Sequence, residues 1–283
     1  MSTELIYSLD FDAYRARPGL SITTLKEMAR SPLHYRHRLT NPKDSEPFAL
    51  GRAAHCAVLE PHRFDTDFAV WDRQTSGGNS APRNGKHWDA FQSVNRGRTI
   101  ITVDQYANAI GMRDAVRSHP DAMKYLRTGD PEVSMFWEFM GRQCRGRIDW
   151  WHESDEFGLV LVGLKSAQDC RQFQFGRQAK RLGYDLQWGY YYDGAKFVTG
   201  RIPDRVVEIV VEAKPPHAVG VYIVSDDDLQ RGMEGYLQLL EQLDECERTD
   251  RWHGPQNSEE VLVLPNWDDS EQIEGIEYVS DGE

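Results

Sequence analysis

Three apolar segments that follow one another along the chain constrain its fold most. They read "EVSMFWEF" (132–139), "CRGRIDWW" (144–151) and "GLVLVGLK" (158–165), with turn-like residues between them. Short segments rich in β-branched and aromatic residues at this spacing predict a meander of three strands. A helix is predicted over about 170–193, and two further strands, "RVVEIVVEA" and "AVGVYIVS", flank the turn "KPPH". This order predicts an α/β fold with a central mixed sheet flanked by helices.

Helices are predicted on both sides of this region in the sequence. Residues 47–60 place small apolar side chains on one helical face, two helical stretches are expected near 87–95 and 103–118, and an amphipathic helix should cover 226–248. Thr24 and Glu27 have capping-box spacing ahead of a short helix that Pro32 should end. Residues 72–86, rich in Gly, Ser and Asn, predict a loop.

Length and charge predict one domain with a distinct tail. At 283 residues the chain is long for one domain and short for two, so we expect a single domain over 1–254 with an N-terminal helical elaboration. Residues 255–283 hold nine of the 45 acids and no Lys or Arg, which leaves 36 acids against 33 bases in the body. A body with a net charge near −3 can carry a local basic groove for phosphate. The apolar piece "VLVLPNW" in the acidic tail has two interpretations: it packs on its own subunit, which we favour, or it docks across a subunit boundary of an assembly.

Several classes of protein fit this sequence poorly. No run approaches the roughly 18 apolar residues that a membrane span needs, and the N-terminus lacks the pattern of a signal peptide. The four cysteines are scattered without a CxxC pair, which argues against a disulfide framework, a zinc site or an iron–sulfur cluster. We therefore expect a cytoplasmic protein with reduced thiols.

The third strand of the meander carries one lysine in an apolar setting. Strand alternation places Leu161, Gly163 and Lys165 on one face. A lysine at the end of a buried strand is costly unless it meets a charge. On the preceding strand Asp149 shares a face with Arg147 and Trp151, so pairing of the two strands should bring Asp149 near Lys165. Acid and lysine then converge on one surface of the sheet.

The predicted helix after the meander adds polar and aromatic groups. Lys180, Tyr184, Gln187 and Tyr191 recur at helical spacing and should form one stripe that faces the strand ends. Upstream, His55 stands in a small, apolar helix. A lone histidine in such a helix is more often a core or surface residue than a ligand, so its neighbours decide its role.

Four blocks occur in order over about residues 20–235: "GRAAHCAVLEP", "CRGRIDWW", "VGLKSAQD" and "YDLQWGYYYDG". With this order and spacing the chain resembles the RecE-type (exonuclease VIII) branch of the PD-(D/E)XK nucleases, phage recombination exonucleases functionally akin to the lambda-type alkaline exonucleases. The resemblance implies a restriction-endonuclease-like core and an exonuclease that uses Mg²⁺ or Mn²⁺. It implies digestion of linear double-stranded DNA from 5′ ends, which leaves 3′ single strands for a single-strand annealing protein. It also implies a homotrimeric ring, encoded by a phage or prophage and acting in the bacterial cytoplasm.

The resemblance also assigns roles to residues. His55 matches the family's motif histidine, as a catalytic and metal-binding residue, and Asp149 matches the first metal-binding aspartate. Lys165 matches the catalytic lysine. Gln187 and Tyr191 match the catalytic glutamine and tyrosine on the helix. The backbone carbonyl of Leu164 can add a neutral oxygen to the metal site.

Gly163 departs from the family pattern, which has an acid at that position. Because Mg²⁺ commonly takes one or two protein carboxylates, a glycine removes one ligand and leaves Lys165 without its nearest anion. We therefore expect this chain to be inactive or impaired, and expect Gly163→Asp to raise its activity. Another acid could substitute, with Glu132 and Glu60 as candidates.

Basic residues near these motifs predict contacts with the phosphate backbone of a duplex end. For each residue alone, a solvated surface is the simpler interpretation. Arg30 or Arg52 is expected to hold the 5′ phosphate. The predicted DNA contacts are Arg30, Arg52, Arg145, Arg147, Arg177 and Lys180, with Arg36, Arg38, Arg142 and Arg181 as further members of the set.

Three alternatives remain open at this stage. A catalytically inactive DNA-end-binding module would use the same groove without cleavage. A RecB-like or CRISPR-associated nuclease with an iron–sulfur cluster is disfavoured by the scattered cysteines. A carbohydrate-active enzyme would need two acids at a fitting separation, and no motif here supplies them.

Overall fold

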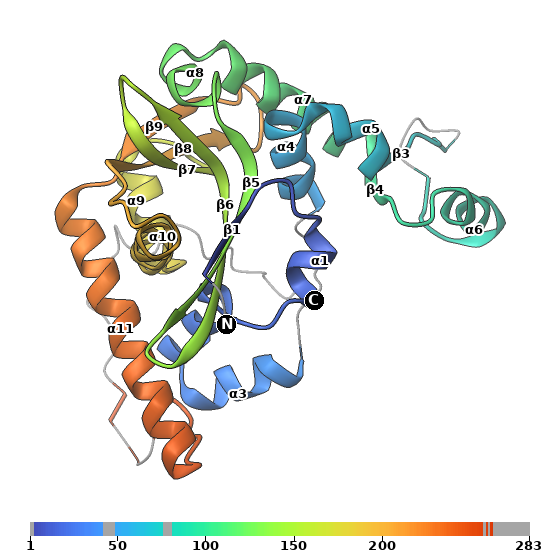
Figure 1. Ribbon diagram of the computed structural model, residues 1–283. Helices are drawn as coiled ribbons and strands as arrows, with labels where there is room; N and C mark the ends of the chain where they lie inside the picture. The colour runs from blue at the N-terminus through green and yellow to red at the C-terminus, as the bar shows by residue number, and fades with distance from the viewer. Residues whose placement is uncertain (1–2, 42–48, 76–80, 257–258, 260, 263–283) are drawn as a thin grey trace.

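The structure is a computed structural model that describes residues 3–41, 49–75, 81–256, 259 and 261–262 (Figure 1). Within these residues seven strands form the main sheet, in the order β1–β5–β6–β7–β8–β9, with β2 alongside β6. β7 pairs with β8, and β2 with β6, in parallel, whereas the other pairs are antiparallel. The predicted α/β fold with a central mixed sheet is therefore confirmed. The strands are β1 (Glu4–Ile6), β2 (Leu20–Ser21), β5 (Asp130–Phe139), β6 (Arg142–Ser154), β7 (Gly158–Ala167), β8 (Arg205–Glu212) and β9 (Val219–Ile223).

Helices cover both faces of this sheet, and small elements precede it (Figure 1). One face packs against α9 (Gln172–Arg181), α10 (Tyr184–Thr199) and α11 (Asp226–Thr249). The other face packs against α4 (Ala49–Leu59), α7 (Val103–Ser118) and α8 (Pro120–Leu126). The N-terminal part contributes α1 (Phe11–Ala16), α2 (Ile22–Leu25), the 3-10 helix η1 (Lys26–Ala29) and α3 (Pro32–Thr40).

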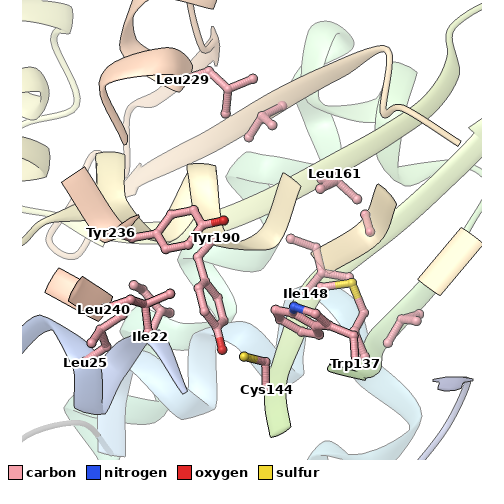
Figure 2. Close-up of a cluster of buried hydrophobic side chains, with 14 of the residues drawn as sticks. Ile22, Leu25, Trp137, Cys144, Ile148, Leu161, Tyr190, Leu229, Tyr236 and Leu240 are labelled. Atoms are coloured by element: carbon pink, nitrogen blue, oxygen red, sulfur yellow. The ribbon is translucent and has the colours of Figure 1, made fainter. Parts of the chain in front are cut away.

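Alternation along β7 divides its side chains between two cores. Leu159 and Leu161 join the core under α10 and α11, shown in Figure 2, where Tyr190 and Tyr236 lie beside Leu240. Val160, Val162 and Leu164 join the core under α4, α7 and α8. Each fully buried aliphatic side chain contributes about 1.5–3 kcal/mol. The sheet is thus held from both sides, and the predicted alternation is confirmed.

The helices α10 and α11 approach each other through glycines. A Cβ added at Gly232 would lie 2.0 Å from the carbonyl oxygen of Asp185, and one at Gly189 would lie 2.4 Å from the backbone nitrogen of Met233. Side chains at these positions would force the helices apart. The close contact fixes α10, the helix that faces the strand ends.

A smaller unit extends to one side of the main sheet (Figure 1). It follows η3 (Pro61–Arg63) and α5 (Phe64–Asp67), and consists of β3 (Phe68–Trp71) paired in parallel with β4 (Thr99–Thr102), and α6 (Gly85–Val94). The ring of Trp71 contacts Trp88 at 5.2 Å and Phe91 at 5.0 Å between centroids. These aromatic contacts hold α6 against the two strands. The predicted helices near 47–60, 87–95 and 103–118 correspond to α4, α6 and α7.

Two details of the predicted elements are wrong. Ser21, not Thr24, caps the short helix, whose helical segment does end at Ala29, ahead of Pro32, as predicted. Pro32 itself begins α3, where its missing N–H costs nothing. The predicted long helix over 170–193 is two helices, because Gly183 adopts a left-handed φ of 63° between α9 and α10. Lys180 therefore belongs to a different helix from Gln187 and Tyr191. The predicted packing of "VLVLPNW" falls largely outside the described residues.

Candidate active site

Asp149 and Lys165 meet on the face of the sheet that α10 covers. The β6–β7 register pairs Trp150 with Val162, which sets Asp149 across from Gly163. The backbone N–H of Leu164 donates to Asp149 Oδ2 at 2.8 Å, and Lys165 Nζ donates to the same oxygen at 3.1 Å. Burial opposes the charged carboxylate, but the Lys165 ammonium and the Leu164 N–H hold the pKa of Asp149 below its ordinary value. The convergence of acid and lysine predicted from strand alternation is confirmed.

Lys165 also faces a second carboxylate, which the sequence reasoning missed. β7 and β8 pair Gly163 with Glu208, and Glu208 Oε2 lies 3.9 Å from Lys165 Nζ. The expectation that Gly163 deprives Lys165 of its nearest anion is therefore wrong. Burial alone would lower the pKa of Lys165, but the carboxylates of Asp149 and Glu208 raise it above its ordinary value. Lys165 is a cation held between two acids.

Glu208 is a buried acid in an apolar strand. It is 3% exposed, and burial raises the pKa of its carboxyl. The indole N–H of Trp188, on α10, donates to Glu208 Oε1 at 2.5 Å. Among the described residues, Glu208 Oε2 has no hydrogen-bond partner. A single glutamate inside "VVEIVV" was the signal in the sequence, by the same argument that singled out Lys165.

Asp149 also approaches a histidine and a third acid. The ligand atoms of His55 on α4, Glu132 on β5 and Asp149 all lie within 4.8 Å of one another. Glu132 adopts a left-handed φ of 53°, which is uncommon for a residue with a side chain and occurs often at functional sites. Burial, and then Asp149, raise the pKa of the Glu132 carboxyl. Glu60, the other acid considered, pairs with Arg63 at 3.1 Å.

The helix α10 completes the site from above the sheet. Gln187 and Tyr191 line a cavity of about 10 Å³, room for about one water molecule, together with Asp149, Gly163, Lys165 and Glu208. Burial raises the pKa of the Tyr191 hydroxyl, and a hydrogen bond with Gln187 opposes this. The structure thus brings Gln187 and Tyr191 to the acid and lysine, as expected. A catalytic role for each stays a prediction.

The donor set of this site fits a hard divalent cation. His55, Glu132 and Asp149 would hold it, with two carboxylates and one imidazole, and Mg²⁺ and Mn²⁺ both accept carboxylate oxygens. Glu208, whose Oε2 accepts no hydrogen bond within the described residues, adds a further carboxylate at the same cavity. The Leu164 carbonyl as a ligand stays a prediction, as does the identity of the metal.

Two of the arginines predicted to contact DNA have internal partners, and their contact with DNA stays a prediction. Arg147 donates to Glu132 Oε2 at 2.5 Å and to the Leu9 carbonyl at 2.8 Å, and its side chain is 8% exposed. Arg145 donates to backbone carbonyls of the α1 region, including that of Arg17 at 2.6 Å. Both side chains tie the N-terminal segment to β6. This placement gives them a structural task that the sequence did not reveal.

The remaining predicted DNA contacts lie closer to the surface. Lys180 pairs with Asp185 at 2.6 Å and Arg30 pairs with Glu27 at 3.1 Å. Arg177 packs over the ring of Phe173, 5.8 Å from its centroid. Arg52 is exposed and, with Arg83, lines a cleft of about 550 Å³ between α4 and the small β3–β4–α6 unit. Of this set, only Arg52 lines that cleft in the described part of the chain.

The fold and the site define the class of this protein. A mixed sheet whose adjacent strands carry Asp149 and Lys165 on one face, beside further acids, is a PD-(D/E)XK-like fold. The chain belongs to the family described as "PDDEXK-like domain of unknown function (DUF3799)", which matches residues 21–264. No curated protein matches the chain. The match shows the PDDEXK-like family, and membership of the RecE-type branch stays a proposal.

Solved structures support the fold assignment. A crystal structure from Eubacterium rectale, named "Putative exonuclease", is 13% identical, with a TM-score of 0.60 over 95% of this chain and 99% of that chain. The structure of SSO0001 is 11% identical and covers 68% of this chain and 85% of that one, but its TM-score of 0.29 is too low to indicate a shared fold. At 13% identity, the similarity to the Eubacterium rectale structure shows a shared fold alone. Within the described residues no helix is both long and apolar enough to cross a membrane.

Proposed function

We propose that this protein is a metal-dependent nuclease that digests linear double-stranded DNA from its 5′ ends and leaves 3′ single strands for recombination by strand annealing. The observation that supports it most is the contact of one carboxylate, Asp149, with both Lys165 and the His55–Glu132 group. Membership of the PDDEXK-like family and the fold shared with the Eubacterium rectale structure support a phosphodiesterase.

The residues of the site have complementary tasks in hydrolysis of a phosphodiester. A bound Mg²⁺ or Mn²⁺ supplies Lewis-acid stabilisation of charge on the phosphoryl oxygens. Asp149 holds Lys165 Nζ at 3.1 Å. The Lys165 cation then places a positive charge where the phosphoryl group develops negative charge. Gln187 and Tyr191 lie at the same cavity and orient polar groups of the substrate.

The cleft beside Arg52 supplies a path for the DNA backbone. Arg52 and Arg83 offer two guanidinium groups at its lining, and guanidinium groups bind phosphates without reading bases. An exonuclease that proceeds along DNA must ignore sequence. We therefore expect affinity that falls steeply with salt and varies little with sequence.

The proposal is tested with duplex DNA of one length in linear and nicked-circular form, labelled at either the 5′ or the 3′ end. Linear DNA should be digested with Mg²⁺ or Mn²⁺, with early release of the 5′ label, and circular DNA should persist. Asp149→Asn and Lys165→Ala should abolish digestion while circular dichroism stays unchanged. Digestion by Lys165→Ala at the wild-type rate would show that the strand is only structural, and early release of the 3′ label would reverse the proposed polarity.

Two assembly properties belong to the same proposal. A homotrimeric ring would let the duplex enter and one strand leave, and the product strand would pass to a single-strand annealing protein. Light scattering at low micromolar concentration measures the mass, and a monomer would overturn the ring. Binding of linear ends without cleavage, in any of the metals tested, would favour the inactive end-binding module that Gly163 first suggested.

A further inference from the structure

Glu208 and Gly163 are complementary in space. They are paired across β7 and β8. A Cβ added to Gly163 would lie 2.5 Å from both Glu208 Oε1 and Glu208 Oε2, closer than real contacts allow. The glycine therefore makes the room that the Glu208 carboxylate occupies. One strand lacks a side chain at the point where its neighbour places an acid.

The surroundings of Glu208 hold one of its oxygens by a hydrogen bond and leave the other without one. Oε1 accepts from the indole N–H of Trp188 at 2.5 Å. Within the described residues, Oε2 is buried without a hydrogen-bond partner, and it lines the same small cavity as Asp149. A buried carboxylate is costly unless its lone pairs are satisfied. The Lys165 ammonium lies 3.9 Å from Oε2, an ion pair beyond hydrogen-bond distance, so this oxygen keeps lone pairs for a ligand in the cavity.

We infer that Glu208 supplies, from β8, a further carboxylate of the metal centre beside Asp149 and Glu132, at the place where Gly163 offers none from β7. This inference rests on the proposed nuclease function. It differs from the expectation for Gly163, because the chain then has a complete set of acids and is active. It also reverses the expected effect of Gly163→Asp: alone, that change sets a second carboxylate against Glu208 and lowers metal affinity.

Titration with Mn²⁺, followed by the electron paramagnetic resonance signal of the free ion, tests this without relying on catalysis. The variants are Glu208→Gln, which keeps an acceptor for Trp188, and Gly163→Asp/Glu208→Ala, which moves the carboxylate back to β7. Asp149→Asn reports on the proposed metal site itself. Glu212→Gln is the matched control: it lies on the same strand, where its side chain accepts from the Cys170 N–H. Thermal unfolding in EDTA checks that each variant is folded.

The expected result is that Glu208→Gln and Asp149→Asn each weaken Mn²⁺ binding at least tenfold. Glu212→Gln should bind as wild type, and the double variant should recover most of the affinity and of the nuclease rate. Wild-type affinity in Glu208→Gln, with a loss in Asp149→Asn, would overturn the role of Glu208 and leave the proposed function standing. Absence of Mn²⁺ binding in the wild type would overturn both. A double variant that folds but binds Mn²⁺ no better than Glu208→Gln would refute the exchange of positions.

Discussion

Replacing Arg147 with methionine should destabilise the protein strongly, because this buried arginine neutralises a half-buried acid. Its side chain is 8% exposed, and it donates to Glu132 at 2.5 Å, to the Leu9 carbonyl at 2.8 Å and to Ser134 Oγ at 3.4 Å. Methionine fills a similar volume but leaves Glu132 beside Asp149 without the cation that pairs with it. Breaking a buried ion pair by removing one partner costs about 3–5 kcal/mol. The free energy of unfolding of Arg147→Met should fall by that amount.

Urea unfolding at neutral pH, followed by circular dichroism, measures this loss. The matched control is the double variant Arg147→Met/Glu132→Gln, which has no unpaired charge and should regain about 2 kcal/mol or more of the loss. A DNA-contacting Arg147, as the sequence suggested, would behave differently: its loss would reduce the slope of DNA affinity against salt by about one and leave stability unchanged. A cost below about 1 kcal/mol for Arg147→Met, or an equal cost in the Glu132→Gln background, would refute the structural role.

Three further outcomes are expected. Burial, and then the charge of Lys165, lower the pKa of Lys26 to about 8 from 10.5, so between these pH values the folded chain binds fewer protons than the unfolded chain. The free energy of unfolding, compared with that of Lys26→Met, should therefore rise through this pH window by on the order of 3 kcal/mol. A difference between the two proteins that does not change with pH would contradict this. Gly232→Ala should lower the free energy of unfolding, measured by chemical denaturation, by more than about 2 kcal/mol, because the new Cβ would lie 2.0 Å from helix backbone. Gly176→Ala has open space around the new Cβ and should stabilise α9 by about 0.5–1 kcal/mol. Arg52→Gln should weaken duplex binding equally for all sequences and lower the slope of DNA affinity against salt by about one. The control Arg248→Gln, on α11, should change neither quantity. An effect of Arg52→Gln that depends on DNA sequence would contradict phosphate binding.

The parts of the site that lie on the meander could be predicted from the sequence. Alternation with a period of two places Asp149, Gly163 and Lys165 on one face, and a short turn fixes the register of neighbouring antiparallel strands. Both features are local in sequence, so residue order alone determines them. The contacts of Asp149 with Leu164 and Lys165 follow from this local geometry.

Glu208 could not be placed in this way because its register depends on tertiary packing. β8 joins β7 in parallel only after two helices have crossed the sheet, and no turn fixes which residues pair. The break at Gly183 was missed because the apolar and aromatic spacing continues through it. The internal partners of Arg147 lie on β5 and in the N-terminal segment, and charge counts along the chain do not distinguish an arginine with such partners from one that faces solvent.

The pairing of Gly163 with Glu208 has a consequence for how the site tolerates motion. When an acid and a lysine stand two residues apart on one strand, the bonds between them keep the two charges close even if the strand leaves the sheet. Here Lys165 and Glu208 lie on different strands, and their separation of 3.9 Å depends on the β7–β8 hydrogen bonds. A slip of β8 by one residue would turn Glu208 to the opposite face of the sheet. The charge arrangement of the site therefore exists only while this strand pair is closed, and it disappears with the first local opening between the two strands.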